Sequence, residues 1–221
     1  MWGTIFNPEN FFFQTIDRIF TVMAMSFLWV ALCIPLVTAG PATAALYYTM
    51  VKCWRRREPY PYKNFVESFR LNFKTGLVAG LVCLAAGQAV AMLLYMFYQM
   101  AASGDRTAVV LLVAGALLAL VLLGYLAFLF PTLSRFDVRL GGLFSLSARL
   151  AAAHAPTTLA LGVLLLVVGS VVRFWPFGLF VLPALTAIWA SLLLERVFKA
   201  EMLRTMEGEL PPEDERPWYL R

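Results

Sequence analysis

The sequence predicts an all-α protein, a polytopic membrane bundle. Of its 221 residues, 61% are hydrophobic and only 14% are charged. Soluble domains have about 45–50% apolar and about 25% charged residues. Several apolar runs also reach the roughly 20 residues that a helix needs to cross the hydrocarbon core. We expect one transmembrane helical domain over residues 1–206 and a polar cytoplasmic tail over 207–221.

The first hydrophobic segment is broken by proline and glycine. It runs without a charge from Ile19 to Val51. The residue before a proline is pushed out of helical geometry, so a break is expected at 35–40 and a second helix from about Pro41 to Arg56. The residues of the break are Pro35, Thr38, Gly40, Pro41 and Thr43, with Thr38 as the expected helix cap. The break is either a kink that lets helices pack or a broken helix that lines a cavity or docks on a partner.

Four further apolar runs follow, at about 75–100, 107–130, 156–172 and 178–197, with a tight turn at Ser103 to Arg106 between the first two. Lysine and arginine gather in cytoplasmic loops. Their distribution favours five spans in a bacterial cell membrane, with the N-terminus outside and the C-terminus cytoplasmic. The alternative is six spans, in which 19–39 and 41–56 form a short hairpin and both termini lie inside.

The segment from Lys52 to Lys74 is the most basic part of the chain. The net charge of +5 therefore indicates cytoplasmic loops that face anionic headgroups of the lipid bilayer rather than a nucleic-acid partner. Phe65, Phe69 and Phe73 recur every four residues, with Arg70 and Lys74 between them. This pattern predicts an amphipathic helix, which lies in the membrane interface or docks on a partner.

Residues for catalysis are few. The only histidine, His154, stands at a membrane edge, and the three cysteines have no metal-ligand spacing. No motif for phosphate binding, metalloprotease or serine hydrolase chemistry is present. We therefore expect no enzyme activity, no cofactor and no metal. The best functional candidate is Glu195, beside Arg196 at the end of a span. Its expected partner is Arg196 or Lys199 on its own helix.

Two stretches of the chain resemble each other. Residues 34–52 align with 182–199, so that Pro35 matches Pro183 and Thr38 matches Thr186. Two halves of related design are known in many membrane folds. In apolar sequence such matches also arise by chance.

The stretch from Trp29 to Tyr48 contains the pattern Leu-x-x-Pro-x-x-Thr-x-Gly-Pro-Ala-Thr-Ala-Ala-Leu. It resembles the YesL-like bacterial membrane proteins, a domain of unknown function whose members are commonly encoded beside ABC-type carbohydrate importers. The resemblance implies an accessory or regulatory protein of carbohydrate uptake, which binds importer subunits or a membrane sensor. The alternative is a small transporter or channel in its own right.

Overall fold

A computed structural model describes residues 11–55, 58–136 and 138–205. Every element in these ranges is helical, which confirms the predicted all-α class. The expected tail at 207–221 lies outside the described residues. In chain order the elements are α1 (Phe11–Cys33), the 3₁₀ helix η1 (Leu36–Thr38), α2 (Ala39–Thr49), the π-helix η2 (Met50–Arg55), α3 (Pro61–Leu71), α4 (Phe73–Ala102), α5 (Arg106–Arg135), α6 (Leu140–Ala153), α7 (Ala155–Phe174), the 3₁₀ helix η3 (Pro176–Phe180) and α8 (Leu182–Thr205).

Four described helices are long and apolar enough to cross a membrane. They are α4, α5, α7 and the stretch Thr15–Cys33 of α1. The chain is thus a multi-pass membrane protein, while the count of five or six crossings stays a prediction. The expected fifth span corresponds to α8, which is not one of the four. Glu195, Arg196 and Lys199 lie in its second half and lower its hydropathy.

The break in the first hydrophobic segment lies where proline and glycine predict it. α1 ends at Cys33, η1 follows Pro35, and α2 begins at Ala39. Pro41 stands in the first turn of α2, where a missing backbone N–H costs no helical hydrogen bond. The helical path then continues through η2 to Arg55, the last described residue before the expected end at Arg56.

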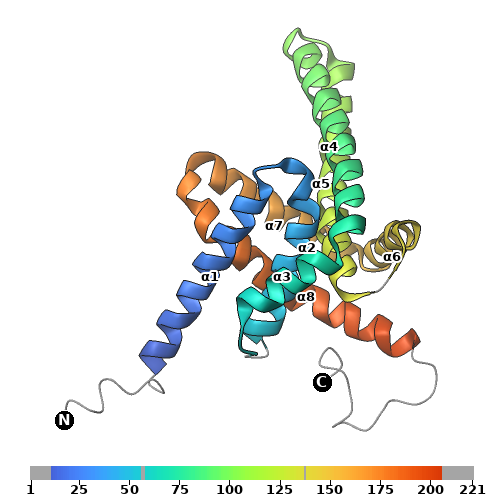
Figure 1. The fold of residues 1–221 in the computed structure, drawn as a ribbon. Coiled ribbons are helices and arrows are strands. Elements are labelled where there is room, and N and C mark those ends of the chain that lie inside the picture. The colour runs from blue at the N-terminus through green and yellow to red at the C-terminus, as the bar shows by residue number, and fades with distance from the viewer. Residues whose placement is uncertain (1–10, 56–57, 137, 206–221) are drawn as a thin grey trace, which may run out of the picture.

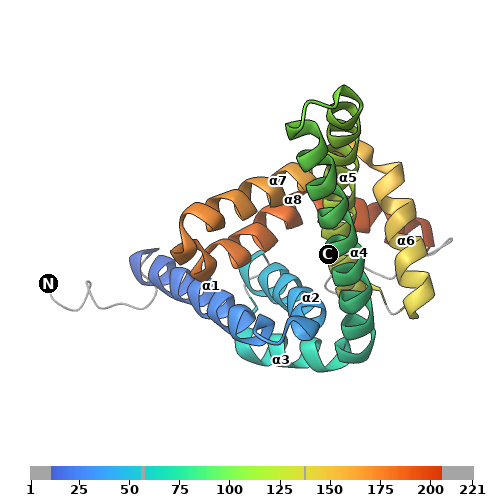
Figure 2. The ribbon, with the colours of Figure 1, turned by 90° about the horizontal axis from the view of Figure 1, so that it is seen from above.

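α2 is the central helix of the molecule (Figures 1 and 2). It contacts α1, α3, α4, α5 and α8, and eight of its residues are buried. The start of α2 lies very close to the backbone of α4. A Cβ atom at Gly40 would overlap the carbonyl oxygen of Gly76, and one at Gly76 would lie 2.9 Å from the nitrogen of Pro41. Small residues allow helices in membranes to pack this closely.

α1 begins at the same end of the molecule as the basic segment. The guanidinium of Arg18 lies 5.7 Å from the ring centroid of Trp54, so α1 and the α2–η2 segment run in opposite directions. This path has the hairpin form that the six-span alternative gives to residues 19–39 and 41–56. The break at Pro35 to Gly40 turns the chain back instead of kinking one long span. Which side of the membrane this end faces stays a prediction.

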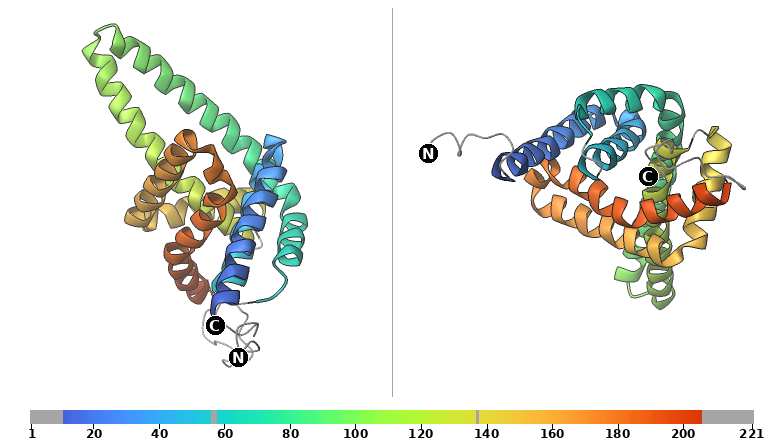
Figure 3. Two further views of the ribbon diagram at one scale, coloured as in Figure 1. Left: turned by 90° about the vertical axis from the view of Figure 1, so that its left-hand side faces the viewer. Right: turned by 90° about the horizontal axis from the view of Figure 1, so that it is seen from below.

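α4 and α5 form a long hairpin that projects from the other helices (Figures 1 and 3). The predicted turn at its tip is confirmed. There, Gly104 has a φ of 96° and the Asp105 carboxylate accepts a hydrogen bond of 2.9 Å from the Thr107 amide. No residue from Leu81 to Thr107 is buried in the described structure. The tip half of the hairpin is therefore exposed, whereas its base packs against α2 and α5 also packs against α7.

Candidate functional site

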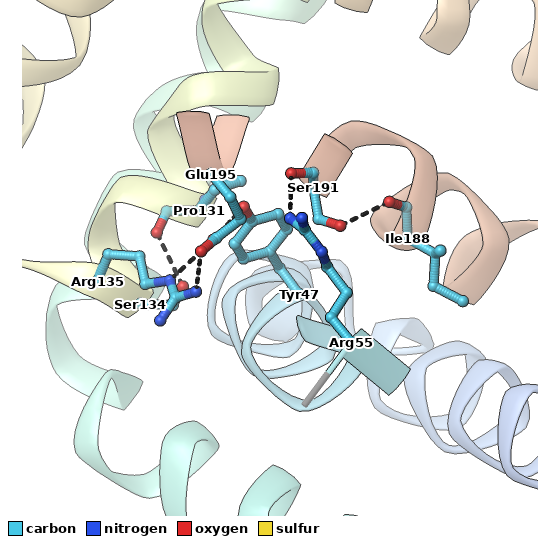
Figure 4. Close-up of polar contacts among 8 residues, drawn as sticks. All are labelled: Tyr47, Arg55, Pro131, Ser134, Arg135, Ile188, Ser191 and Glu195. Carbon is cyan, nitrogen blue, oxygen red and sulfur yellow. Dashed lines mark hydrogen bonds and ion pairs between the residues drawn. The ribbon is translucent and has the colours of Figure 1, made fainter. Parts of the chain in front are cut away.

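Glu195 on α8 joins two other helices (Figure 4). Its Oε1 atom accepts a 2.8 Å hydrogen bond from the Tyr47 hydroxyl of α2 and a 3.1 Å hydrogen bond from Nε of Arg135 at the end of α5. Its Oε2 atom accepts a 2.5 Å hydrogen bond from Nη2 of Arg135. The arginine thus holds the carboxylate through two parallel bonds, the strongest form of this pair. We call Tyr47, Arg135 and Glu195 the carboxylate clamp.

The carboxylate clamp is inside the protein. The exposed fractions of the side chains are 1% for Arg135 and 13% for Glu195, and Tyr47 is 2% exposed. A buried charge is costly unless its partner and hydrogen bonds compensate it. Removal of one partner from such a pair costs about 3–5 kcal/mol, because the other charge then stays buried alone. The clamp therefore fixes α2, α5 and α8 relative to one another.

Arg55 adds a second link to α8. Its Nη1 atom donates a 2.9 Å hydrogen bond to the carbonyl oxygen of Ser191, one turn before Glu195 (Figure 4). The Ser191 hydroxyl donates to the carbonyl of Ile188 at 2.6 Å. Arg55 is the last residue of the π-helix η2. The central helix is thus tied to α8 at both Tyr47 and Arg55.

The partner of Glu195 differs from the one expected. Arg196 and Lys199 are exposed, and the described ion pair of Glu195 is with Arg135. Arg196 is turned to the surface, whereas Glu195 is turned toward Tyr47 of α2 and Arg135 of α5. The pair with Arg135 joins residues 60 positions apart and depends on how α5 crosses α8. Spacing along one helix cannot reveal such a contact.

Tyr47 and Glu195 occupy matching positions in the two similar stretches of sequence. They are separated by 148 residues, the same offset that matches Pro35 to Pro183. In both places a 3₁₀ helix precedes a helix, η1 before α2 and η3 before α8. The similarity of residues 34–52 to residues 182–199 could therefore have drawn attention to Tyr47 and Glu195 as equivalent positions.

The two threonines of the break stabilise the turn. Thr38 was expected to cap α2, but its side chain forms no capping hydrogen bond. Its hydroxyl instead donates to the carbonyl oxygens of Leu32 and Pro35 near the end of α1. Thr43 donates to the carbonyl of Ala39 at 2.7 Å and accepts a 3.1 Å hydrogen bond from the indole of Trp29. These bonds satisfy polar groups that the break would otherwise leave without a partner.

The phenylalanines of α3 divide between the core and the surface. α3 is amphipathic as predicted, but Phe65 is only 1% exposed and packs against α1 and α2. This corrects its assignment to an outer face, because an aromatic ring is better buried against Met25 and Met50. Phe69 and Phe73 are partly buried, and Arg70 and Lys74 are exposed. The role of these four residues at a lipid or partner interface stays a prediction.

The carboxylate clamp is suited to holding helices together. Both oxygens of Glu195 already accept bonds from protein donors, which leaves them poorly placed to bind a ligand. Within the described ranges, no group of three or more His, Cys, Asp or Glu side chains has a geometry that could hold a metal ion.

Comparison with family models matches residues 22–100 to a family described as a protein of unknown function, DUF624. The match includes most of α1, the break, α2, α3 and nearly all of α4. The narrower YesL-like assignment stays a prediction. No curated protein and no solved structure matches the chain.

Proposed function

We propose that this protein is an accessory or regulatory membrane protein of carbohydrate uptake, which acts by binding another membrane protein through the α4–α5 hairpin. The carbohydrate part of the proposal rests on the resemblance of Trp29 to Tyr48 to YesL-like proteins. The contact part rests on an apolar groove in the hairpin. The partner would be a membrane subunit of an ABC-type oligosaccharide importer or its membrane sensor.

The groove lies between α4, α5 and Phe144 of α6 and has a volume of about 300 Å³. Cys83, Gly87 and Ala91 of α4 line it at intervals of four residues, so that they share one helix face. Rows of small residues at this spacing let a second transmembrane helix approach closely. At Gly87 no atom lies within 4 Å of the position of a Cβ. This open space at the groove is the observation that carries the proposal.

The hairpin is also longer than the membrane is thick. α4 and α5 each have 30 residues, which corresponds to about 45 Å of helix against a hydrocarbon core of about 30 Å. Such a helix tilts or packs against other helices to avoid exposing apolar side chains to water. A partner helix in the groove would cover part of this excess length.

Two matched glycine substitutions test the proposal. Gly87 and Gly169 both lie inside helices, and neither has an atom within 4 Å of the position that a Cβ would occupy. Gly87→Leu fills the groove, whereas Gly169→Leu adds the same side chain to an exposed face of α7. We expect a stoichiometric importer subunit to co-purify from the native membrane in mild detergent with the wild type and Gly169→Leu, but not with Gly87→Leu.

Both variants must retain the thermal stability of the wild type, since leucine favours a helix more than glycine does. Purification of a wild-type protein without any importer subunit would contradict the proposal. So would equal recovery of the subunit with Gly87→Leu.

A transporter would need a polar path through the membrane, and Thr38 and Thr43 are the threonines of the break that could line one. Both hydroxyls form hydrogen bonds within the α1–α2 turn, which accounts for them without a path. Sugar flux into liposomes that contain only this protein would favour the alternative.

A further inference from the structure

A second concavity lies beside the start of the candidate span Thr15–Cys33 of α1. It is half open, has a volume of about 480 Å³ and is lined by residues of α1 and η2 and by residues 58–61. Its lining includes Asp17, Arg18, Cys53, Trp54, Glu58 and Tyr60. We call it the α1–η2 pocket. It is separate from both the carboxylate clamp and the groove of the hairpin.

Two irregular pieces of backbone border this pocket. One is the six-residue π-helix η2, which contributes Cys53 and Trp54. The other is Tyr60, the only non-glycine residue with a positive φ in the described ranges, at 67°. Helical π-turns and left-handed backbone at bulky residues are unfavourable and tend to occur at functional sites. Their meeting at one pocket indicates that the pocket is a binding site.

The lining combines a positive charge with a carboxylate that is available to a ligand. The Arg18 guanidinium lies over the Trp54 ring, and Glu58 pairs with Lys52 at 3.2 Å. Among the described residues, no hydrogen bond or ion pair reaches the Asp17 carboxylate. A simple anion would be repelled by Asp17, and a simple cation by Arg18. A ligand with both charges satisfies both residues.

The surroundings of the pocket are typical of the level of lipid headgroups. Asp17 and Arg18 are in the first turn of the candidate span Thr15–Cys33. Tryptophan and tyrosine, here Trp54 and Tyr60, gather at the membrane–water boundary. Next to the pocket, α1 exposes the apolar side chains of Ile19, Phe20 and Met23, which suit the acyl chain of a lipid.

We propose that the α1–η2 pocket binds a phosphoethanolamine group, with Asp17 accepting hydrogen bonds from the ammonium and Arg18 donating to the phosphate. The membrane supplies this group as the headgroup of an aminophospholipid. Soluble phosphoethanolamine has the same chemistry and is the other source to be distinguished.

Cys53 provides a reporter inside the pocket. Burial raises the pKa of the Cys53 thiol, the nearby Glu58 raises it further, and the hydrogen bond from Asn64 partly opposes this. Only the thiolate reacts with maleimide, so Cys53 reacts slowly at neutral pH and faster as the pH rises. At a fixed pH, a ligand that covers the pocket slows the reaction further.

The test uses full-length protein with Cys33→Ala and Cys83→Ala, purified in detergent and washed free of lipid. Dihexanoyl-phosphatidylethanolamine is titrated while the alkylation of Cys53 is followed, and binding is confirmed by native mass spectrometry. We expect protection of Cys53 and an affinity about tenfold lower in Asp17→Asn, since one hydrogen bond to a charged group is weakened. The matched control Glu67→Gln removes the same charge from the exposed face of α3 and leaves the affinity unchanged.

Soluble phosphoethanolamine that protects Cys53 at the same concentration would support the pocket chemistry and identify a soluble source. Equal protection by dihexanoyl-phosphatidylglycerol, which has no ammonium, would overturn the proposal. An unchanged affinity in Asp17→Asn would do the same.

Discussion

Glu195 brings together side chains from three helices that are far apart in the chain. Its carboxylate accepts hydrogen bonds from Tyr47 and Arg135. Arg55 donates to the backbone of α8, the helix that carries Glu195. All three donors reach α8 within about one turn, at Ser191 and Glu195. At the scale of the residue, the stability of the bundle therefore depends strongly on one buried acid.

Glu195→Gln is expected to lower the free energy of unfolding by about 3–5 kcal/mol, because Arg135 would stay buried without its anion. Thermal unfolding in detergent measures this. The control Glu67→Gln removes the same charge from an exposed position of α3, so the expected loss is at most about 0.5 kcal/mol.

The double variant Arg135→Met, Glu195→Met tests whether the loss of stability comes from leaving one charge of the pair buried alone. It removes both charges and is expected to lose much less stability than the sum of the two single methionine variants. Additive losses would show that the two side chains do not act as a pair.

The sequence singled out Glu195 as a candidate but did not reveal its partner Arg135. An acid at the end of an apolar helix is conspicuous because burial of its charge is costly. Its partner depends on the crossing of α5 and α8, which no local pattern records. For the same reason the burial of Phe65 was missed: its periodicity predicts an amphipathic helix but not which neighbour covers the apolar face.

At the scale of the element, the central feature is the close contact between the first turn of α2 and the backbone of α4. Gly40 and Gly76 bring the two backbones into contact, and Pro41 lies there in the first turn of α2. The break was predictable because proline and glycine act on the local backbone. The π-helix η2 and the helix α6 were not predicted. Leu143, Ser147 and Leu150 of α6 are buried at helical spacing, a pattern that could have identified it.

Gly76→Ala is expected to destabilise the protein by about 1–3 kcal/mol, because the new Cβ would press on the Pro41 backbone. Gly87→Ala is the matched control on the same helix. Its Cβ meets open space, and alanine stabilises a helix relative to glycine by about 1 kcal/mol. If both variants unfold at the same temperature in detergent, the close contact of α2 with α4 is not as described.

At the scale of the whole molecule, α1 starts beside the basic segment, and the α4–α5 hairpin carries its tip away from both. Single cysteines at Asp17, Tyr62 and Gly104 test this arrangement in a background without the natural cysteines. An impermeant maleimide should label positions 17 and 62 from one side of the membrane and position 104 from the other. Labelling of positions 17 and 104 from the same side would instead place the start of α1 on the side opposite to the basic segment.

The sequence predicted a helical membrane protein, the break and the hairpin turn, because each depends on composition or on short patterns. The direction of α1 relative to the basic segment was left open between the five-span and the six-span alternatives. It depends on whether a broken segment kinks or reverses, and the hydrogen bonds of Thr38 and the contact of Gly40 with α4 decide this. Charge counting alone could not separate the two paths.

The measurement that tests the proposed function most directly is photo-crosslinking in the native membrane. A benzophenone amino acid replaces Val90 in the groove or, as a control, Val163 on the exposed face of α7. The proposal predicts a covalent adduct between position 90 and a membrane subunit of a carbohydrate importer, absent from position 163 and abolished by Gly87→Leu. Adducts with lipid alone at both positions would contradict it.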